Sequence, residues 1–146
     1  MMVAIRAGLL FLAGALLVWV DRRWDLPEGR MPNFLSLPLL GLGLIGAALF
    51  RDPSGLILWP AFYLGWRGGG VGAGDAKVWM GISGLAGIYG TAVGLVVLVA
   101  LARLRAWRMG YGWHFGLRPP ARVPMALPSA GMAWAGALLW VLEAMG

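Results

Sequence analysis

Two aspartates lie beside apolar segments of the chain, where a charged side chain is unfavourable in lipid and suggests a function. Asp75 follows the glycine-rich stretch GGGVGAG, and Asp25 lies in WDLPEGRMPNFLSLPLL, shortly before a second apolar run. Two carboxyl groups that share a site can hold a single proton between them. The ionised group can then take a proton from water while the neutral group polarises a carbonyl, which is how aspartic peptidases hydrolyse peptide bonds.

The rest of the sequence offers few other chemistries. It contains no cysteine and a single histidine, His114, which excludes thiolate zinc sites, cysteine nucleophiles and multi-histidine metal sites. We expect no cofactor and no metal. Acid–base chemistry must therefore draw largely on the carboxyl groups, which belong to Asp21, Asp25, Glu28, Asp52, Asp75 and Glu143.

Both aspartates also have simpler explanations. Asp75 precedes an apolar segment and could cap the N-terminus of a helix by accepting backbone N–H groups. Asp25 could be a solvated loop residue paired with Arg22 or Arg30. The sequence around each residue leaves these alternatives open.

The residues that flank the two aspartates have types that suit a site. Gly72 and Gly74 let the backbone take conformations closed to other residues and let another chain approach closely. Lys77 can extend to the membrane boundary or bias the charge of a nearby carboxylate. Pro32 suits the first turn of a helix and Asn33 suits a cap, so an apolar helix is expected to begin there.

The composition indicates a polytopic membrane protein. Apolar residues make up 60% of the chain and charged residues 12%, against about a quarter in soluble domains, and the mean hydropathy is +0.78. Nine tryptophans fit this class, since indole rings favour the membrane–water boundary. The net charge is +6, and the arginines lie in loops between the apolar runs, so membrane topology explains the charge better than nucleic-acid binding does. The N-terminal apolar run is expected to be a retained helix, because no signal-peptidase pattern closes it.

The sequence predicts one all-α domain, residues 1–146, with about six transmembrane helices, some of them short. Basic residues gather in loops 21–33, 67–77 and 103–123, which share one side if the chain turns back near Gly87–Gly90. That side is then cytoplasmic, and both termini lie outside. The basic and aromatic part of the last loop, 106–123, is expected to lie at the membrane surface. The expected apolar segments are about 3–20, 34–50, 54–66, 76–89, 90–104 and 124–143.

The two aspartate motifs together resemble a known family. The pattern Asp-x6-Pro-Asn followed by Leu-x-Leu-Pro-Leu, and then Gly-x-Gly-Asp-x-Lys, is similar to that of the type IV prepilin peptidases, which are GxGD aspartyl peptidases. Here the first motif begins at Asp25 and includes Pro32 and Asn33, and the second is GAGDAK, residues 72–77. A looser match is PMALP, residues 124–128. The resemblance spans about residues 15–135.

This resemblance implies an enzyme, a membrane aspartyl endopeptidase with Asp25 and Asp75 as its catalytic pair. It implies a multi-pass protein of the cytoplasmic (inner) membrane with the pair at the cytoplasmic face. The implied substrates are type IV pilin-like precursors, which carry a short basic leader before a hydrophobic helix and are cut just after a glycine. The implied partners are thus these precursors and the lipid bilayer, with no nucleic acid.

The chain departs from the longer members of the family. It lacks their cysteine zinc motif, so it resembles the short, peptidase-only branch that includes the peptidases of Flp (tight-adherence) pili, and N-methyltransferase activity is not expected. Trp24 stands at a position where a smaller or aliphatic residue is commoner in the family. Ala76 stands at a position where valine is commoner.

Two other classes remain as alternatives. A non-enzymatic transporter or channel subunit could use the acids for ion or proton passage, since intramembrane acids often serve that purpose. Such a relay needs polar groups along its depth, and the apolar segments contain few, chiefly Ser36, Ser83 and Thr91. The presenilin and signal-peptide-peptidase type of GxGD protein carries its first aspartate after a tyrosine inside a helix, in much longer chains.

Overall fold

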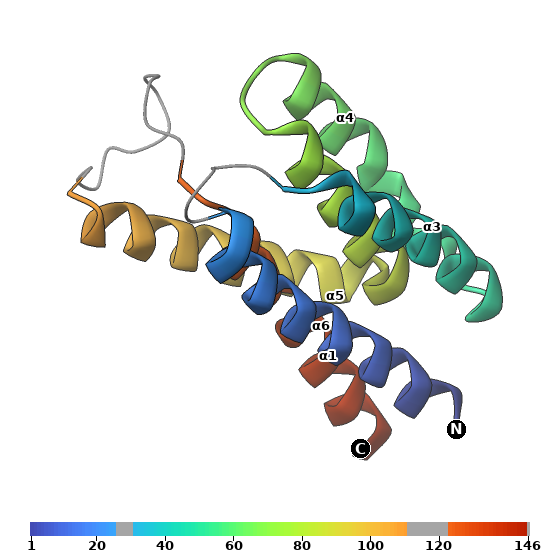
Figure 1. Cartoon of the computed structure of the whole chain (residues 1–146). Helices are drawn as coiled ribbons and strands as arrows, with labels where there is room; N and C mark the ends of the chain where they lie inside the picture. The colour runs from blue at the N-terminus through green and yellow to red at the C-terminus, as the bar shows by residue number, and fades with distance from the viewer. Residues whose placement is uncertain (26–30, 111–122, 146) are drawn as a thin grey trace.

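The computed structural model describes residues 1–25, 31–110 and 123–145, and this part of the chain is helical with no strand (Figure 1). Much of the loop 106–123 with His114, and Glu28 and Arg30 of the first motif, lie outside the described residues. The elements are α1 (Met2–Val20) with a π-helical turn (Asp21–Asp25), α3 (Asn33–Leu49), a 3₁₀ segment (Pro53–Leu58), α4 (Trp59–Arg67), α5 (Ala73–Arg108) and α6 (Ala126–Met145).

The number of membrane-spanning helices differs from the expected six. In the described part of the chain, three helices are long and apolar enough to cross a membrane: α1 with its π-helical turn, α5 and α6. α3 is apolar but has only 17 residues, and the segment expected at 54–66 is divided between the 3₁₀ segment and the nine-residue α4. A full crossing needs about 20 residues. The count of about six is therefore not supported.

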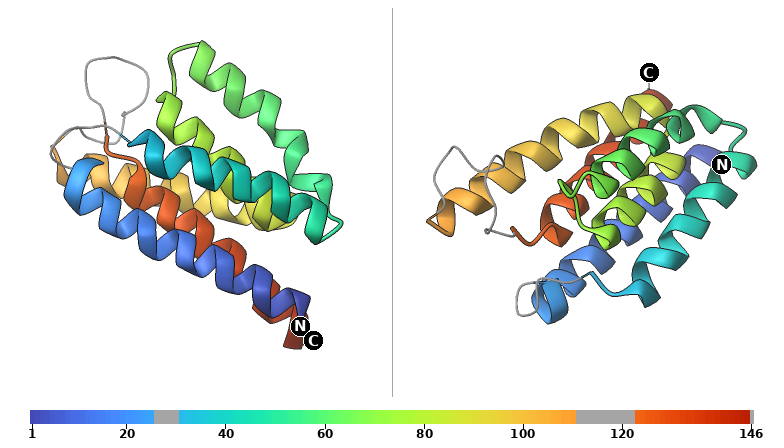
Figure 2. Two further views of the ribbon diagram at one scale, coloured as in Figure 1. Left: turned by 45° about the vertical axis from the view of Figure 1, so that its right-hand side comes forward. Right: turned by 90° about the horizontal axis from the view of Figure 1, so that it is seen from above.

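The segments expected at 76–89 and 90–104 form the single element α5, which is interrupted at Gly87. Gly87 has φ +71° and ψ 179°, which is not helical. The two ends of α5 both approach the end of α1, since Asp75 lies near Asp25 and Arg105 binds Asp21. A straight helix would separate Asp75 from Arg105 by about 45 Å. The chain therefore turns back at Gly87, as predicted, and Figure 2 shows the two arms.

Four of the backbone groups beside this break are bonded to side chains. The guanidinium of Arg6 donates to the carbonyl of Leu85, and the indole of Trp140 donates to that of Ala86 at 2.9 Å. On the other side of the break, the N–H of Ile88 donates to the Ser54 hydroxyl at 3.0 Å, and the Thr91 hydroxyl donates to the Gly87 carbonyl at 2.6 Å. An irregular turn at membrane depth requires such partners, because lipid offers none.

α5 is the central element of the fold and packs against α3 and α6, while α1 packs against α6 (Figure 2). Glycines allow α3 and the first arm of α5 to touch through their backbones. A Cβ on Gly81 would lie 2.4 Å from the Leu39 carbonyl oxygen, and a Cβ on Gly84 would lie 2.4 Å from that of Gly43. Small residues at helix interfaces are the usual means of close packing in membranes.

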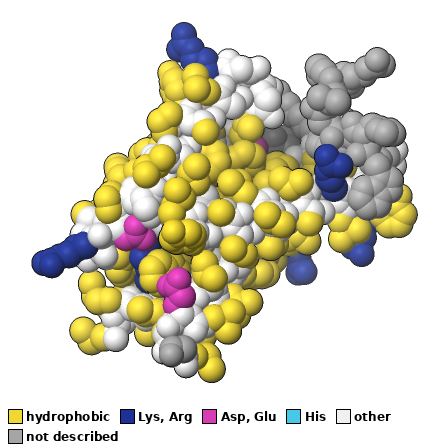
Figure 3. Space-filling view, turned by 180° about the vertical axis from the view of Figure 1, so that it is seen from behind, with side chains coloured by type: hydrophobic (Ala, Val, Ile, Leu, Met, Phe, Trp, Pro, Cys, Tyr) yellow, Lys and Arg dark blue, Asp and Glu magenta, His cyan; other side chains and the backbone are white. Residues whose placement is uncertain are grey.

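The outer surface of the described residues is largely apolar. Phe11 and Leu16 of α1, Leu44 of α3 and Leu138 of α6 are all exposed, and hydrophobic side chains cover most of the face in Figure 3. A soluble protein rarely exposes such an extensive apolar surface, whereas lipid contact requires it. The structure is thus compatible with a membrane protein.

Candidate active site

The first acidic residues of the candidate site lie on the π-helical turn that ends α1. Asp21 and Asp25 lie four residues apart on this turn, and each exposes only 4% of its surface. The two residues are brought to the N-terminal end of α6, more than a hundred positions away in the sequence. The PMALP segment therefore belongs to the same site as the first motif.

Asp25 binds the first turn of α6 directly. Its Oδ2 accepts the N–H of Ala126 at 2.7 Å, and the Oδ1 of Asp21 accepts the N–H of Leu127 at 3.2 Å. Free N–H groups and the helix dipole both favour a negative charge at this place. Asp25 is therefore not a solvated loop residue, and in the described part of the chain its partner is the α6 backbone instead of an arginine.

Asp21 has a second, ionic partner. Nη1 of Arg105, near the end of α5, lies 2.5 Å from Asp21 Oδ1, and Nη2 lies 3.0 Å from Oδ2. Both side chains are mostly buried, at 6% exposure for Asp21 and 11% for Arg105. This bidentate pair ties α1 to the second arm of α5 and neutralises the acid next to Asp25.

Asp75 supplies the second carboxyl group of the predicted pair. It lies in the first turn of α5 and close enough to Asp25 for the negative charge of Asp25 to act on it. Its Oδ1 is buried and has no hydrogen-bond partner among the described residues. α5 begins after Gly72 with no side-chain cap, so Asp75 is not a helix cap, which was the simpler explanation of this residue. The predicted pair, Asp25 and Asp75, therefore lies within electrostatic reach of one another.

The two glycines of the second motif keep space around this pair. A Cβ on Gly72 would lie 2.8 Å from Asp75 Oδ2, so glycine leaves one side of the carboxylate open. A Cβ on Gly74 would lie 2.5 Å from the Cβ of Met31 and 3.0 Å from its carbonyl oxygen. Glycine at position 74 therefore lets the segment before α3 pack directly on the start of α5.

The remaining residues of the two motifs meet beside the carboxyl groups. Lys77 Nζ donates to Asn33 Oδ1 at 3.0 Å, which links α5 to α3. Pro32 is the N-cap of α3, and its carbonyl accepts the N–H groups of Leu35 and Ser36. Asn33 is the first residue of α3 and binds the lysine, so it is not the cap that the sequence suggested. Lys77 acts here as a link between helices, and among the described residues it makes no bond to either aspartate.

Arg105 is a part of this site that sequence reasoning missed, and the N-terminus of α6 was indicated only by the looser PMALP match. In the sequence, Asp21 is distinguished only by its position four residues before Asp25, a spacing that puts two acids on the same face of a helix. Nothing local indicates that Arg105 pairs with Asp21 or that Ala126 binds Asp25.

Comparison of the chain with protein-family models, with curated proteins and with solved structures found no match.

Proposed function

We propose that this protein is a membrane aspartyl endopeptidase that removes the leader peptide of type IV (Flp-type) prepilins. The observation that carries the proposal is the pairing of Asp25 with Asp75, in which one Asp75 oxygen is buried and has no partner among the described residues. A buried carboxyl oxygen without a bond is costly unless a substrate or water supplies one. The two motif aspartates therefore leave a position where a reacting group can bind.

The surroundings of the two carboxyl groups suit different roles. Asp25 accepts the Ala126 N–H at the positive end of α6, which suits it better than Asp75 to be the ionised group that takes a proton from water. Asp75 lies beside that charge with an unbonded, buried oxygen, which suits the protonated form that polarises the scissile carbonyl. Water then attacks the peptide carbon, Asp25 accepts its proton, and the amine leaves after protonation by the pair.

The proposed site lies at the cytoplasmic face of the inner membrane, where the leader of a pilin precursor meets its hydrophobic helix. Basic residues cluster at this end of the described molecule, on the ends of α1 and α5, and basic residues mark cytoplasmic ends. The turn at Gly87 lets α5 cross twice and return to that face. If the two arms of α5 are counted as separate crossings, six crossings remain a proposal. This proposal needs the shorter segments to lie in a thinned region of the bilayer.

An ion or proton pathway receives less support from the same structure. Of the polar residues within the apolar segments, Thr91 donates to the Gly87 carbonyl and Ser83 donates to the Met80 carbonyl. Each hydroxyl thus serves a local backbone bond. The hydroxyl of Ser36, the third of these residues, is buried and has no hydrogen-bond partner among the described residues, so the three hydroxyls are not linked to one another.

The test is co-expression of a Flp-type prepilin with the wild type and with Asp25→Asn and Asp75→Asn. We expect each variant to leave the leader uncut, because an amide can neither accept the proton from water nor share one with its partner. Glu143→Gln is the matched control, since Glu143 is an exposed acid near the far end of α6, and it should cut like the wild type. Leader removal that persists in either aspartate variant at normal expression would refute the proposal.

A further inference from the structure

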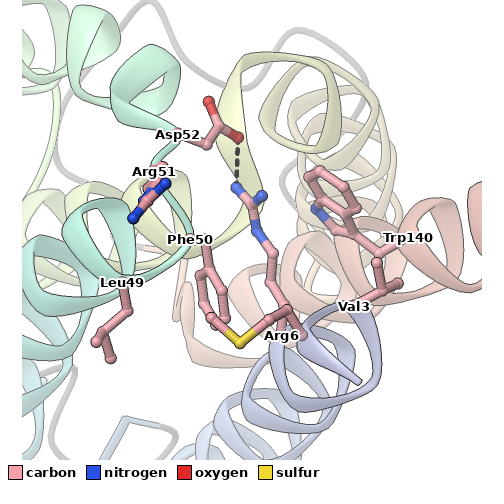
Figure 4. A pocket seen from close by; sticks show the side chains of 8 residues that line it. Val3, Arg6, Leu49, Phe50, Arg51, Asp52 and Trp140 are labelled. Atoms are coloured by element: carbon pink, nitrogen blue, oxygen red, sulfur yellow. Dashed lines mark hydrogen bonds and ion pairs between the residues drawn. The ribbon is translucent and has the colours of Figure 1, made fainter.

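A second polar cluster lies at the opposite end of the molecule, beside the break in α5. Arg6 is 3% exposed and donates from Nη2 to Asp52 Oδ2 at 2.6 Å. Its guanidinium lies 3.9 Å from the centre of the Trp140 ring and 5.2 Å from that of Phe50. Figure 4 shows Arg6 between these two rings, with the dashed bond to Asp52. The role proposed for Asp25 and Asp75 does not involve this cluster.

The cluster borders a pocket of about 540 Å³. Its walls come from the start of α1, the end of α3 and the last part of α6, which are the ends of apolar helices. Most of the lining is apolar, and three charged side chains interrupt it (Figure 4). The lining residues are Met2, Val3, Arg6, Leu49, Phe50, Arg51, Asp52 and Trp140.

The charged residues of the pocket leave an excess of one positive charge. Burial raises the pKa of Asp52, but the hydrogen bonds from Ser54 and Arg6 outweigh it and hold the pKa below its ordinary value. Asp52 is therefore ionised at neutral pH and balances Arg6. Arg51 is exposed, and no ion pair or hydrogen bond of its side chain occurs among the described residues. Within the described part of the chain, its guanidinium is therefore free for a ligand.

Arg51 occupies a position where the backbone favours glycine. The N–H of Arg51 donates to the Ala48 carbonyl at 3.2 Å and that of Asp52 donates to the Ala47 carbonyl at 3.0 Å, which is the Schellman pattern at the end of a helix. The φ of Arg51 is +53°, and Arg51 is the one non-glycine residue with a positive φ in the described part of the chain. Strain of this kind in a non-glycine residue often marks a ligand site.

We propose that this pocket binds the headgroup of an anionic phospholipid. The Arg51 guanidinium would donate to the phosphate, and the apolar walls would hold the start of the acyl chains. The excess positive charge selects an anion, and the position at the ends of apolar helices selects an amphiphile. The strained backbone at Arg51 is then the cost of placing a guanidinium at the mouth of the pocket.

The test uses Arg51→Gly in the full-length protein, purified in detergent, with phosphatidylglycerol or phosphatidylcholine added to the micelles. Without added lipid, this variant should unfold at the same temperature as the wild type or higher, because glycine relieves the backbone strain. Phosphatidylglycerol should raise the unfolding temperature of the wild type and leave that of Arg51→Gly unchanged. The affinity of phosphatidylglycerol for Arg51→Gly should be at least about tenfold lower than for the wild type, because the variant lacks a charge-assisted hydrogen bond.

The matched control is Arg103→Ala, which removes an exposed arginine from the second arm of α5. It should keep the full effect of phosphatidylglycerol. Glycerol phosphate, which has the headgroup charge without acyl chains, should have no effect, and neither should phosphatidylcholine. An equal loss in both arginine variants would mean that only net charge matters, and a full response of Arg51→Gly to phosphatidylglycerol would equally overturn the proposal.

Discussion

Asp21 and Asp25 are chemically identical side chains on one turn, yet their partners give them different roles. Asp21 is held by the Arg105 guanidinium, whereas Asp25 binds the backbone at the start of α6 and lies close enough to Asp75 to act on it electrostatically. Arg105 therefore opposes the effect of a third negative charge at the site. In the proposed peptidase, Asp21 and Arg105 are positioning residues that act through Asp25 and α6.

Replacing Arg105 should show how far the fold depends on its ion pair with Asp21. In Arg105→Ala, the buried carboxylate of Asp21 loses its ionic partner, so we expect a loss of about 3 kcal/mol in the free energy of unfolding. Adding Asp21→Asn should recover part of this loss, because the double variant has no unpaired charge. Thermal unfolding in detergent measures both effects. If the double variant is less stable than Arg105→Ala, the charge of Asp21 is not the reason for the loss.

At the scale of elements, the sequence predicts most helices well. The segments expected at about 3–20, 34–50 and 124–143 agree closely with α1, α3 and α6, because each is a long apolar run bordered by charged residues, proline or glycine. The segment expected at 54–66 was only partly correct, since a 3₁₀ segment precedes the short α4. Hydrophobicity cannot distinguish these two forms of helix.

The turn within α5 was predictable for a different reason. No charged residue interrupts 78–102, and the apolar pattern alone is compatible with one long helix. The distribution of basic residues on either side favoured a reversal near Gly87–Gly90, and the structure has one at Gly87. The partners of the turn, Arg6, Ser54 and Trp140, were not predictable, because they come from distant parts of the sequence and no local pattern links them.

Gly87→Ala should damage this turn. The alanine would have a positive φ, and its Cβ would lie 2.4 Å from Asp52 Oδ2 and 3.0 Å from Arg6 Nη2. We expect a loss of about 2 kcal/mol or more in the free energy of unfolding, measured by thermal or denaturant unfolding in detergent.

Gly8→Ala is the matched control for this prediction. Gly8 lies in α1, and a Cβ there would meet nothing within 4 Å, so alanine should be neutral or slightly stabilising. Equal stability of the Gly87→Ala and Gly8→Ala variants would contradict the role of Gly87 in reversing α5.

At the scale of the whole molecule, the two polar clusters lie at opposite ends of an apolar helical body. One end combines three aspartates with Arg105, and the other combines two arginines with Asp52. The reversal of α5 produces this separation, since it returns Arg105 to the end where Asp75 lies and leaves Gly87 beside Arg6. The pairing of Asp25 with Asp75 follows from the same reversal and from the packing of Gly74 on Met31.

The pairing of the two aspartates could be anticipated from the sequence only through their motifs and their common position at basic loops. Neither residue carries a local signal that it meets the other. The binding of Asp25 to the Ala126 N–H, across 101 residues, had no signal at all beyond the PMALP pattern. Long-range contacts of this kind depend on how the helices pack, which a single sequence does not encode in any short stretch.

The claim on which the account depends is that Asp25 and Asp75 form one site, and thiol cross-linking tests it directly. The chain has no cysteine, so the Asp25→Cys and Asp75→Cys double variant carries two unique thiols. The control pair is Asp75→Cys with Glu143→Cys, since Glu143 lies about 25 Å along α6 from the end that binds Asp25. In lipid, a short bifunctional thiol reagent should link residues 25 and 75 within one chain and leave the control pair unlinked. Failure to link 25 with 75 under conditions where both thiols react singly would contradict the site and the function proposed from it.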